Sequence, residues 1–176
     1  MNVQNQLWQA LFDFVAKSDA EGLLAFLQNS QPINVIEVRD HLGFSLINFA
    51  CLKNETSCFK VLFEYSNAHK VSMGTNLEMR GDHTEKDITE WLSRPNQFGF
   101  VPMHWATQAG NYTMLTTMAD KGNVDLHYKN KYGASFLHIA AQKNQPLSLY
   151  FFYSRGVDIN VTDLFNFTPL HWACHC

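Results

Sequence analysis

The sequence predicts an all-α solenoid of helix-turn-helix units, with about four to five repeats of which the last is incomplete. Three histidines, His104, His138 and His171, lie 34 and 33 residues apart. In the same register around each of them, a turn-forming residue precedes the histidine and a pair of small residues follows it. Independent columns that recur with one period are typical of stacked helical units. We therefore expect a one-dimensional stack of helix pairs.

The N-terminal region, residues 1–39, is expected to contain a helix pair. Apolar residues recur at helical spacing over residues 5–28, which indicates two amphipathic helices. Ser18 and Glu21 have the spacing of a capping box, which predicts that the second helix begins there. We interpret this region as a degenerate N-terminal capping repeat, because the terminal repeats of an array are atypical.

Each following repeat is expected to begin with a tight turn. Asp and Asn side chains form such turns by accepting a hydrogen bond from the backbone two residues on, and the recurring positions are Asp40, Asn96, Asn130 and Asp163. A glycine three residues later supplies the positive φ that the turn needs, at Gly43, Gly99 and Gly133. The turn residues therefore place one turn ahead of each helix pair.

The first helix of each repeat is expected to start at a hydroxyl cap and to end at a left-handed residue. The caps, which accept bonds from free backbone N–H groups, are Ser45, Ser135 and Thr168. The left-handed position is held by Asn54, Gly110 and Asn144. An apolar second helix follows, at Ser57–Tyr65, Tyr112–Ala119 and Leu147–Tyr153. These elements divide the chain into repeats at 40–65, 98–130 and 131–163 and a truncated repeat at 164–176.

Residues 66–97 do not fit the period and are expected to form an insertion in a finger loop between two repeats. Within it, Thr84 and Asp87 predict a short capped helix that ends near Leu92. Insertions in repeat arrays often map to a binding face, which favours a specificity loop. Long surface insertions are also tolerated at small entropic cost, so both interpretations stay open.

The segments GFVPMHWATQAGN, GASFLHIAAQKNQ and NFTPLHWACHC together resemble the ankyrin repeat. The resemblance is strong over residues 96–176 and fair over 40–65. It implies that His104, His138 and His171 bond to the backbone of neighbouring repeats. The departures from the family pattern are Val101 in place of the capping Thr, Phe136 in place of Pro and Asn48 in place of His.

A more specific resemblance covers residues 133–174. The run LHIAAQKNQPLSLYFFYSRGVDINVTDLFNFTPLHWAC looks like the ankyrin segment of membrane palmitoyltransferases of the DHHC class. In that family the array recognises substrate proteins and precedes transmembrane helices, and a cysteine-rich loop with Asp-His-His-Cys carries the acyl group. The sequence contains no such motif, so the resemblance implies a recognition module to which no catalytic residue can be assigned.

Composition and charge restrict the partners. The 176 residues are 46% hydrophobic and 16% charged, with a formal net charge of −3, which argues against nucleic acid as the main partner. No run approaches the ~18 apolar residues of a membrane helix, and the start of the chain lacks the basic region of a signal peptide. Four cysteines do not indicate a disulfide framework. We expect a cytoplasmic protein that does not insert into a membrane, located at the cytosolic face if it is part of a palmitoyltransferase.

The sequence predicts no catalytic residue, no cofactor and no metal site. It contains neither a Gly-rich phosphate loop nor a nucleophile elbow. The tail HWACHC brings together His171, Cys174, His175 and Cys176. The repeat pattern accounts for the first two, and the spacing matches no common zinc signature. We therefore expect a binding module rather than an enzyme.

The turn tips and the exposed side of the first helices are expected to bind a protein partner. In the ankyrin family these positions usually form the binding face, and the corresponding residues are Phe98, Phe100, Trp105, Gln108, Tyr132, Ile139, Phe165, Phe167, Trp172 and His175. The set is unusually aromatic, and aromatic side chains dominate interface energetics. The alternative is that some rings, Trp105 and Trp172 above all, pack between neighbouring repeats.

The last repeat starts a first helix without a partner helix, so Leu170 would lose about 1–2 kcal/mol of packing. We expect further chain or a neighbouring subunit to cover this end. The leading function is a non-catalytic protein-interaction module that binds through its concave aromatic face. The alternatives are the N-terminal substrate-recognition part of a DHHC-type protein S-palmitoyltransferase and a structural subunit of a large assembly.

Overall fold

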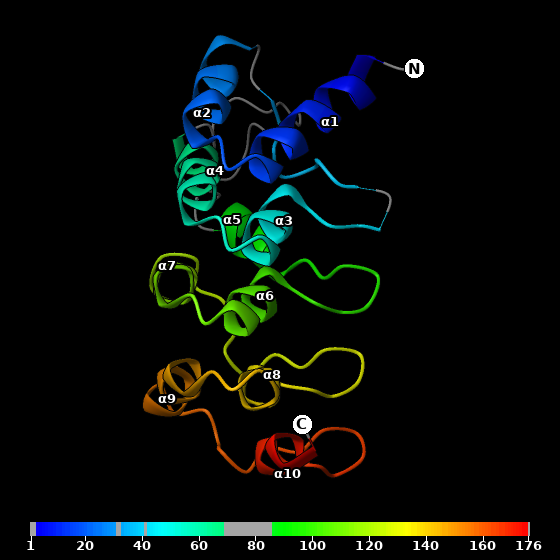
Figure 1. The fold of residues 1–176 in the computed structure, drawn as a ribbon, viewed down its shortest axis with the longest axis vertical. Helices are drawn as coiled ribbons and strands as arrows, with labels where there is room; N and C mark the ends of the chain where they lie inside the picture. The colour runs from blue at the N-terminus through cyan, green and yellow to red at the C-terminus, as the bar shows by residue number, and fades with distance from the viewer. Residues whose placement is uncertain (1–2, 31–32, 41, 69–85, 176) are drawn as a thin grey trace, which may run out of the picture.

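The computed structural model describes residues 3–30, 33–40, 42–68 and 86–175. Within these ranges the helices form two rows and one additional element (Figure 1). The inner row consists of α1 (Val3–Ala16), α3 (Leu46–Leu52), α6 (Pro102–Ala109), α8 (Phe136–Gln142) and α10 (Pro169–His175). The outer row consists of α2 (Ala20–Asn29), α4 (Thr56–Ala68), α7 (Tyr112–Asp120) and α9 (Pro146–Ser154). The remaining helix, α5 (Lys86–Ser93), lies beside α6.

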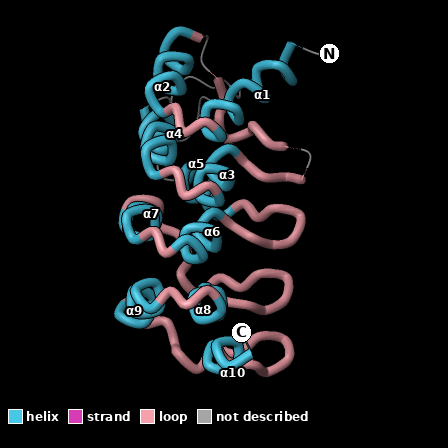
Figure 2. Tube along the Cα trace, viewed as in Figure 1, coloured by secondary structure: helices cyan, strands magenta, loops and turns pink. Residues whose placement is uncertain are grey.

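The two rows stack along one axis, with the N-terminus at one end and α10 at the other. Each inner helix contacts the next inner helix, and each outer helix contacts the next outer helix. The long turns that precede α3, α6, α8 and α10 project to one side of the stack as fingers (Figure 2). The all-α solenoid of helix pairs that the sequence predicts is therefore confirmed over the described residues.

The fingers have the turn geometry expected of their Asx residues. Oδ1 of Asn96 accepts hydrogen bonds from the N–H groups of Phe98 and Phe100, both at 3.0 Å. Asp40, Asn130 and Asp163 make the same pair of bonds in the other fingers. Because these bonds are local, each finger is specified by its own few residues.

The backbone has positive φ at the glycines that the sequence places in the finger turns. The finger glycines Gly99 and Gly133 have φ values of 81° and 74°. Gly133 also faces the next finger closely, because a Cβ atom there would lie 2.6 Å from the backbone nitrogen of Leu164. Glycine at this position is therefore required by the approach of the next finger as well as by φ.

The hydroxyl cap predicted at the first helices holds at Ser45 but not at Ser135. Oγ of Ser45 accepts the N–H of Asn48 at 3.3 Å. The hydroxyl of Ser135 instead lies 2.9 Å from Nδ1 of His138, which also accepts the Ser135 N–H at 3.2 Å. The histidine thus takes the place that Glu holds in a capping box, because it bonds back to the N-cap backbone.

The same imidazole cap recurs in two other repeats. Thr168 donates its N–H to Nδ1 of His171 at 3.0 Å and keeps its hydroxyl 2.8 Å from that nitrogen. Val101 lacks a hydroxyl, yet its N–H still reaches Nδ1 of His104 at 3.1 Å. The substitution of Val for the usual Thr therefore leaves this backbone cap intact.

The predicted Ser18–Glu21 capping box is wrong. The residue that caps α2 is Asp19, whose carboxylate accepts the N–H of Gly22 at 2.8 Å. Ser18 has a φ of 59° and donates its hydroxyl to Glu55 at 2.7 Å. A left-handed residue at the end of α1 and an Asp directly after it leave no room for the cap one residue earlier.

The second helices are slightly longer than the sequence predicts. The structure places them at Thr56–Ala68, Tyr112–Asp120 and Pro146–Ser154. Within one layer, Phe136 of α8 packs on Phe152 of α9 with ring centroids 5.1 Å apart, and between layers Tyr112 of α7 meets Phe151 of α9 with centroids 5.6 Å apart. The core is thus a continuous strip along the stack, as expected for repeats that bury their apolar faces against neighbours.

The short helix predicted near Leu92 corresponds to α5. Its Ile88, Trp91 and Leu92 are buried, and Thr89 donates its hydroxyl to the carbonyl of Gly122 at 2.9 Å. The predicted cap at Thr84 and the side chain of Asp87 lie outside the described residues. The apolar face of α5 attaches this part of residues 66–97 to the array.

Candidate functional site

Large apolar side chains occupy the same register position at the tip of each finger. Phe98, Tyr132 and Phe165 follow the turn-forming Asx by two residues, and 44%, 53% and 73% of their surfaces are exposed. Leu42 occupies this position in the first finger and is also exposed. Sequence reasoning missed Leu42, although the register itself identifies it. We call these four residues the finger-tip column.

The inner helices contribute a second set of residues, and these are less exposed. Trp105, Gln108 and Trp172 are half-buried, whereas His175 is exposed. Ile139 is only 5% exposed, so its inclusion among the binding residues is wrong. It is a smaller side chain at the register position of the two tryptophans, and it lies within the buried face of α8.

Trp105 packs between two fingers. Its ring centroid lies 5.4 Å from Phe44 of the preceding finger and 5.2 Å from Phe100 of its own finger. Its Nε1 finds no hydrogen-bond partner among the described residues. This indole is therefore a contact between repeats that also borders the surface.

Trp172, at the equivalent position of α10, makes different contacts. Its Nε1 donates to Oδ2 of Asp163 at 2.9 Å, and its ring meets His138 edge-on at 5.2 Å. Burial raises the pKa of Asp163, but the bonds from the Phe167 N–H and from the indole outweigh it and lower the pKa overall. The ionised carboxylate therefore holds the indole in place.

The three register histidines differ in what they bond. Nε2 of His138 donates to the carbonyl of Phe167 in the next finger at 2.9 Å, because its Nδ1 is occupied as an acceptor. Nε2 of His104 has no partner of hydrogen-bond geometry among the described residues, although the Ala134 carbonyl lies near enough to favour the protonated ring. His171 is exposed. The backbone contact implied by the resemblance is thus complete only at His138.

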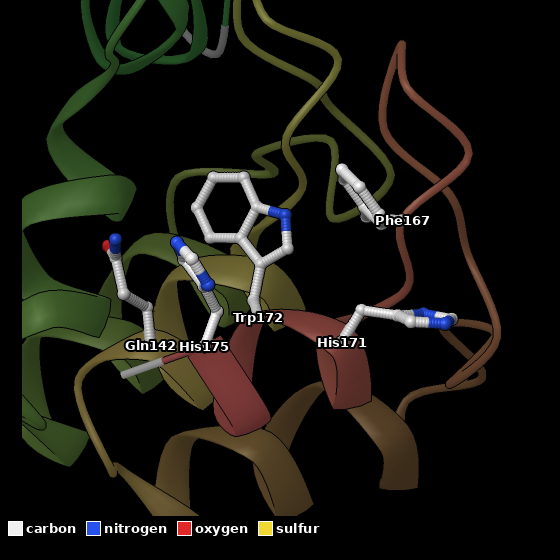
Figure 3. A pocket seen from close by; sticks show the side chains of 5 residues that line it. All are labelled: Gln142, Phe167, His171, Trp172 and His175. Carbon is white, nitrogen blue, oxygen red and sulfur yellow. The ribbon is translucent and has the colours of Figure 1, made fainter.

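A pocket of about 360 Å³ opens beside Trp172 on this face (Figure 3). Its walls are Gln142 of α8, Phe167 of the last finger and three residues of α10, namely His171, Trp172 and His175. In Figure 3 the side chains of Gln142 and His175 lie next to the indole, and Phe167 stands on the other side of it. The pocket therefore combines aromatic walls with polar groups that can donate hydrogen bonds.

The described residues contain no group of three or more His, Cys, Asp or Glu side chains placed to hold a metal ion. None of the helices in the described part of the chain combines the length and the apolar character that a membrane span requires.

Comparison with known proteins identifies the repeat. Residues 81–163 match the family model of ankyrin repeats in three copies. The regulatory subunit p28 of the 26S proteasome from Saccharomyces cerevisiae is 30% identical over 80 residues, which cover 45% of this chain and 35% of that protein. Human transient receptor potential cation channel subfamily A member 1 is 30% identical over 83 residues, 47% of this chain and 7% of the channel.

An ankyrin repeat protein of fowlpox virus is 42% identical over 53 residues, which cover 30% of this chain and 27% of the viral protein. The matched segments span about a third or less of these curated relatives. The described residues therefore have the fold of an all-α ankyrin-repeat solenoid, and ankyrin repeats indicate a protein–protein interaction module.

Proposed function

We propose that the chain binds a protein partner through the finger-tip column and the exposed side of α6, α8 and α10, without catalysis of its own. The observation that carries the proposal is the exposure of Phe98, Tyr132 and Phe165 at one register position of successive fingers. Exposed apolar surface arranged in a continuous row usually marks a binding site. The remaining residues of this face are Phe100, Trp105, Gln108, Phe167 and Trp172.

The experiment is capture of partners from a cell extract, followed by mass spectrometry. We expect the double variant Phe98→Ala/Phe165→Ala to lose the proteins that the wild type captures while its urea unfolding midpoint stays nearly unchanged. The matched control is Leu147→Ala/Tyr150→Ala, which removes two exposed large apolar residues from the outer helix α9. If the control loses the same proteins and the finger-tip variant keeps them, the binding face lies on the outer row instead.

A second candidate is the N-terminal substrate-recognition part of a DHHC-type S-palmitoyltransferase. It is supported by the sequence pattern of residues 133–174, whereas the three relatives described above are named as a proteasome regulatory subunit, a cation channel and an ankyrin repeat protein. The gene sequence downstream of residue 176 tests it. Four membrane spans with an Asp-His-His-Cys motif would support this candidate, and a stop codon would contradict it.

A third candidate is a structural subunit of a large assembly. It is supported by the apolar surface of the last repeat, where Leu170 is 72% exposed and Leu164 is 69% exposed. One relative is itself named as a proteasome subunit. A native complex in which another chain packs on Leu170 and Trp172 would favour this candidate over the first.

A further inference from the structure

Positive charge is concentrated in one repeat of the array. Between Asp125 and Asp158 the sequence contains no acidic residue, and its basic residues there are Lys129, Lys131, Lys143 and Arg155. The formal net charge of the whole chain is −3, so the rest of the chain is acidic. The repeat that carries Tyr132 at its finger tip is therefore the cationic part of the molecule.

Three of these cations belong to the finger and inner-helix side. Nζ of Lys131 donates to the Gln97 carbonyl at 2.6 Å and Nζ of Lys129 to the Thr162 carbonyl at 2.7 Å, which holds both ammonium groups along the fingers. Lys143 is exposed and directly follows the pocket residue Gln142 at the end of α8. Arg155 is excluded, because it pairs with Asp120 of the outer helix α7 at 3.0 Å.

The carboxylate nearest in sequence to the pocket wall does not reverse this charge pattern. Asp163 is 7% exposed, and it accepts bonds from the N–H groups of Phe165 and Phe167 and from the indole of Trp172. The adjacent Thr162 carbonyl accepts from Lys129. Its carboxylate is therefore buried and occupied by local donors, whereas His171 and His175 of the pocket wall and the neighbouring Lys143 are exposed.

The two tryptophans of the inner helices have different aromatic neighbours. In the repeat with Trp105, the preceding finger supplies Phe44, whose ring packs on the indole. In the repeat with Trp172, the residue at the register of Phe44 is Ala134, which brings no ring. Trp172 turns instead to Asp163 and His138, and a space of about 360 Å³ opens beside it.

We propose that the partner is an acidic peptide segment that inserts an aromatic side chain into the pocket beside Trp172. This inference rests on the proposed function, because it names the partner of the same face. An aromatic ring in the pocket would give Trp172 a further ring contact, similar in kind to the contact between Phe44 and Trp105. Aromatic pairs prefer offset-stacked or edge-to-face arrangements.

The carboxylates of the segment would meet Lys143, which directly follows the pocket residue Gln142 at the end of α8. Charge complementarity of this type mainly increases the association rate and the selectivity for the partner. Binding of the acidic segment should therefore weaken as salt is added, because the lysines are exposed and screened within about 10 Å at 0.1 M ionic strength.

The test is selection from a phage library of random 16-residue peptides on the full chain. Clones are compared for binding to the wild type and to Phe167→Ala, which removes one wall of the pocket. We expect the clones that prefer the wild type to be rich in Asp and Glu and to share one Phe, Tyr or Trp. Enriched clones that are neutral or basic would overturn the inference and leave the proposed function standing.

A matched pair of charge reversals tests the same inference on one selected peptide. Lys143 and Lys53 are both exposed C-cap residues of inner helices, α8 and α3, but only Lys143 directly follows a residue of the pocket wall, Gln142. We expect Lys143→Glu to weaken peptide binding about three- to tenfold in fluorescence anisotropy, and Lys53→Glu to change it less than about twofold. Equal effects of the two variants would show that only the overall charge of the chain matters, which overturns the pocket site.

Selection could also yield no clone that distinguishes the wild type from Phe167→Ala. That outcome overturns the inference that a linear segment enters this pocket. The proposed function has its own test in partner capture with the finger-tip variant, so the failure of one is distinguishable from the failure of the other.

Discussion

His104, His138 and His171 occupy one position of the repeat and meet three different environments. The ring of His138 connects two layers, because Nδ1 accepts from Ser135 and Nε2 donates to Phe167. His104 is equally buried but lacks the second bond, and His171 is exposed. At the residue scale, the same amino acid at one position of the repeat therefore contributes different amounts to the free energy of folding.

We expect His138→Leu to lower the free energy of unfolding by about 2–3 kcal/mol, because it leaves buried backbone groups of two repeats without partners. The matched variant His171→Leu, in the same register, should cost less than about 1 kcal/mol, because water replaces what it loses. Urea unfolding followed by circular dichroism measures both. Similar losses in the two variants would contradict an inter-repeat role for His138.

The buried His104 makes stability depend on pH. Burial lowers its pKa from 6.5 to about 4, so the folded state favours the neutral ring. The resulting stability is fully present above about pH 6.5 and is lost as the pH falls toward 4, because the unfolded chain then binds the proton more readily. Between pH 7 and 4 we expect the wild type to lose about 2–3 kcal/mol more than His104→Leu. Urea titrations of both proteins at several pH values test this, and parallel curves would refute it.

At the scale of the element, the finger is the most locally determined part of the structure. Its turn depends on bonds within five residues, such as those from Tyr132 and Ala134 to Asn130. Its stacking, in contrast, depends on the next finger, where the Leu164 N–H donates to the Tyr132 carbonyl at 3.3 Å. Gly133 meets both requirements, because it adopts the positive φ of the turn and leaves room for the next finger.

We expect Gly133→Ala to destabilise the chain by at least about 1 kcal/mol more than Gly156→Ala. Both glycines have positive φ, 74° and 83°, so the backbone strain is similar. A Cβ atom at Gly133 would meet the backbone of Leu164, whereas at Gly156 no heavy atom lies within 4 Å. Thermal unfolding of the two variants measures the difference. Equal changes in Tm would mean that the fingers separate easily.

At the scale of the whole molecule, position in the stack decides how much a residue contributes. Leu137 of α8 and Leu170 of α10 share a register position, yet the first is completely buried and the second is 72% exposed. The layers on both sides of α8 account for this difference, because α6 and α10 pack against it.

We expect Leu137→Ala to cost about 2–5 kcal/mol, because it creates a cavity in the shared core. Leu170→Ala should stay within about 0.5 kcal/mol in the isolated chain, as for most surface substitutions. Denaturant unfolding measures both changes. A large loss from Leu170→Ala would show that α10 is held more tightly than its exposure indicates.

Much of the fold could be predicted because its signals are local and repeated. The Asx turns, the positive φ at Gly99 and the left-handed ends at Asn54 and Asn144 each depend on a few neighbouring residues. The capping of α2 was predicted wrongly at Ser18 because a competing Asp19 offers the better geometry one residue later. The predicted repeat boundaries and the role of residues 66–97 stay predictions.

The candidate site was less predictable, because burial is a property of neighbours. Ile139 and Trp172 share a column, but Ile139 lies in the buried face of α8 while Trp172 borders the pocket. Whether a tryptophan packs on rings or turns to a carboxylate depends on the residue that the preceding finger presents, Phe44 in one case and Ala134 in the other. Which residue of the preceding finger faces each tryptophan is known only from how the two repeats stack.

The sequence by itself determined the period, the order of turn and helix, and the residues that begin and end each element, since all of these depend on interactions over a few residues along the chain. The tertiary structure decided which members of each column are core and which are surface, how the register histidines are bonded, and where the pocket opens. These features depend on contacts between adjacent layers, and such contacts form only when the repeats stack.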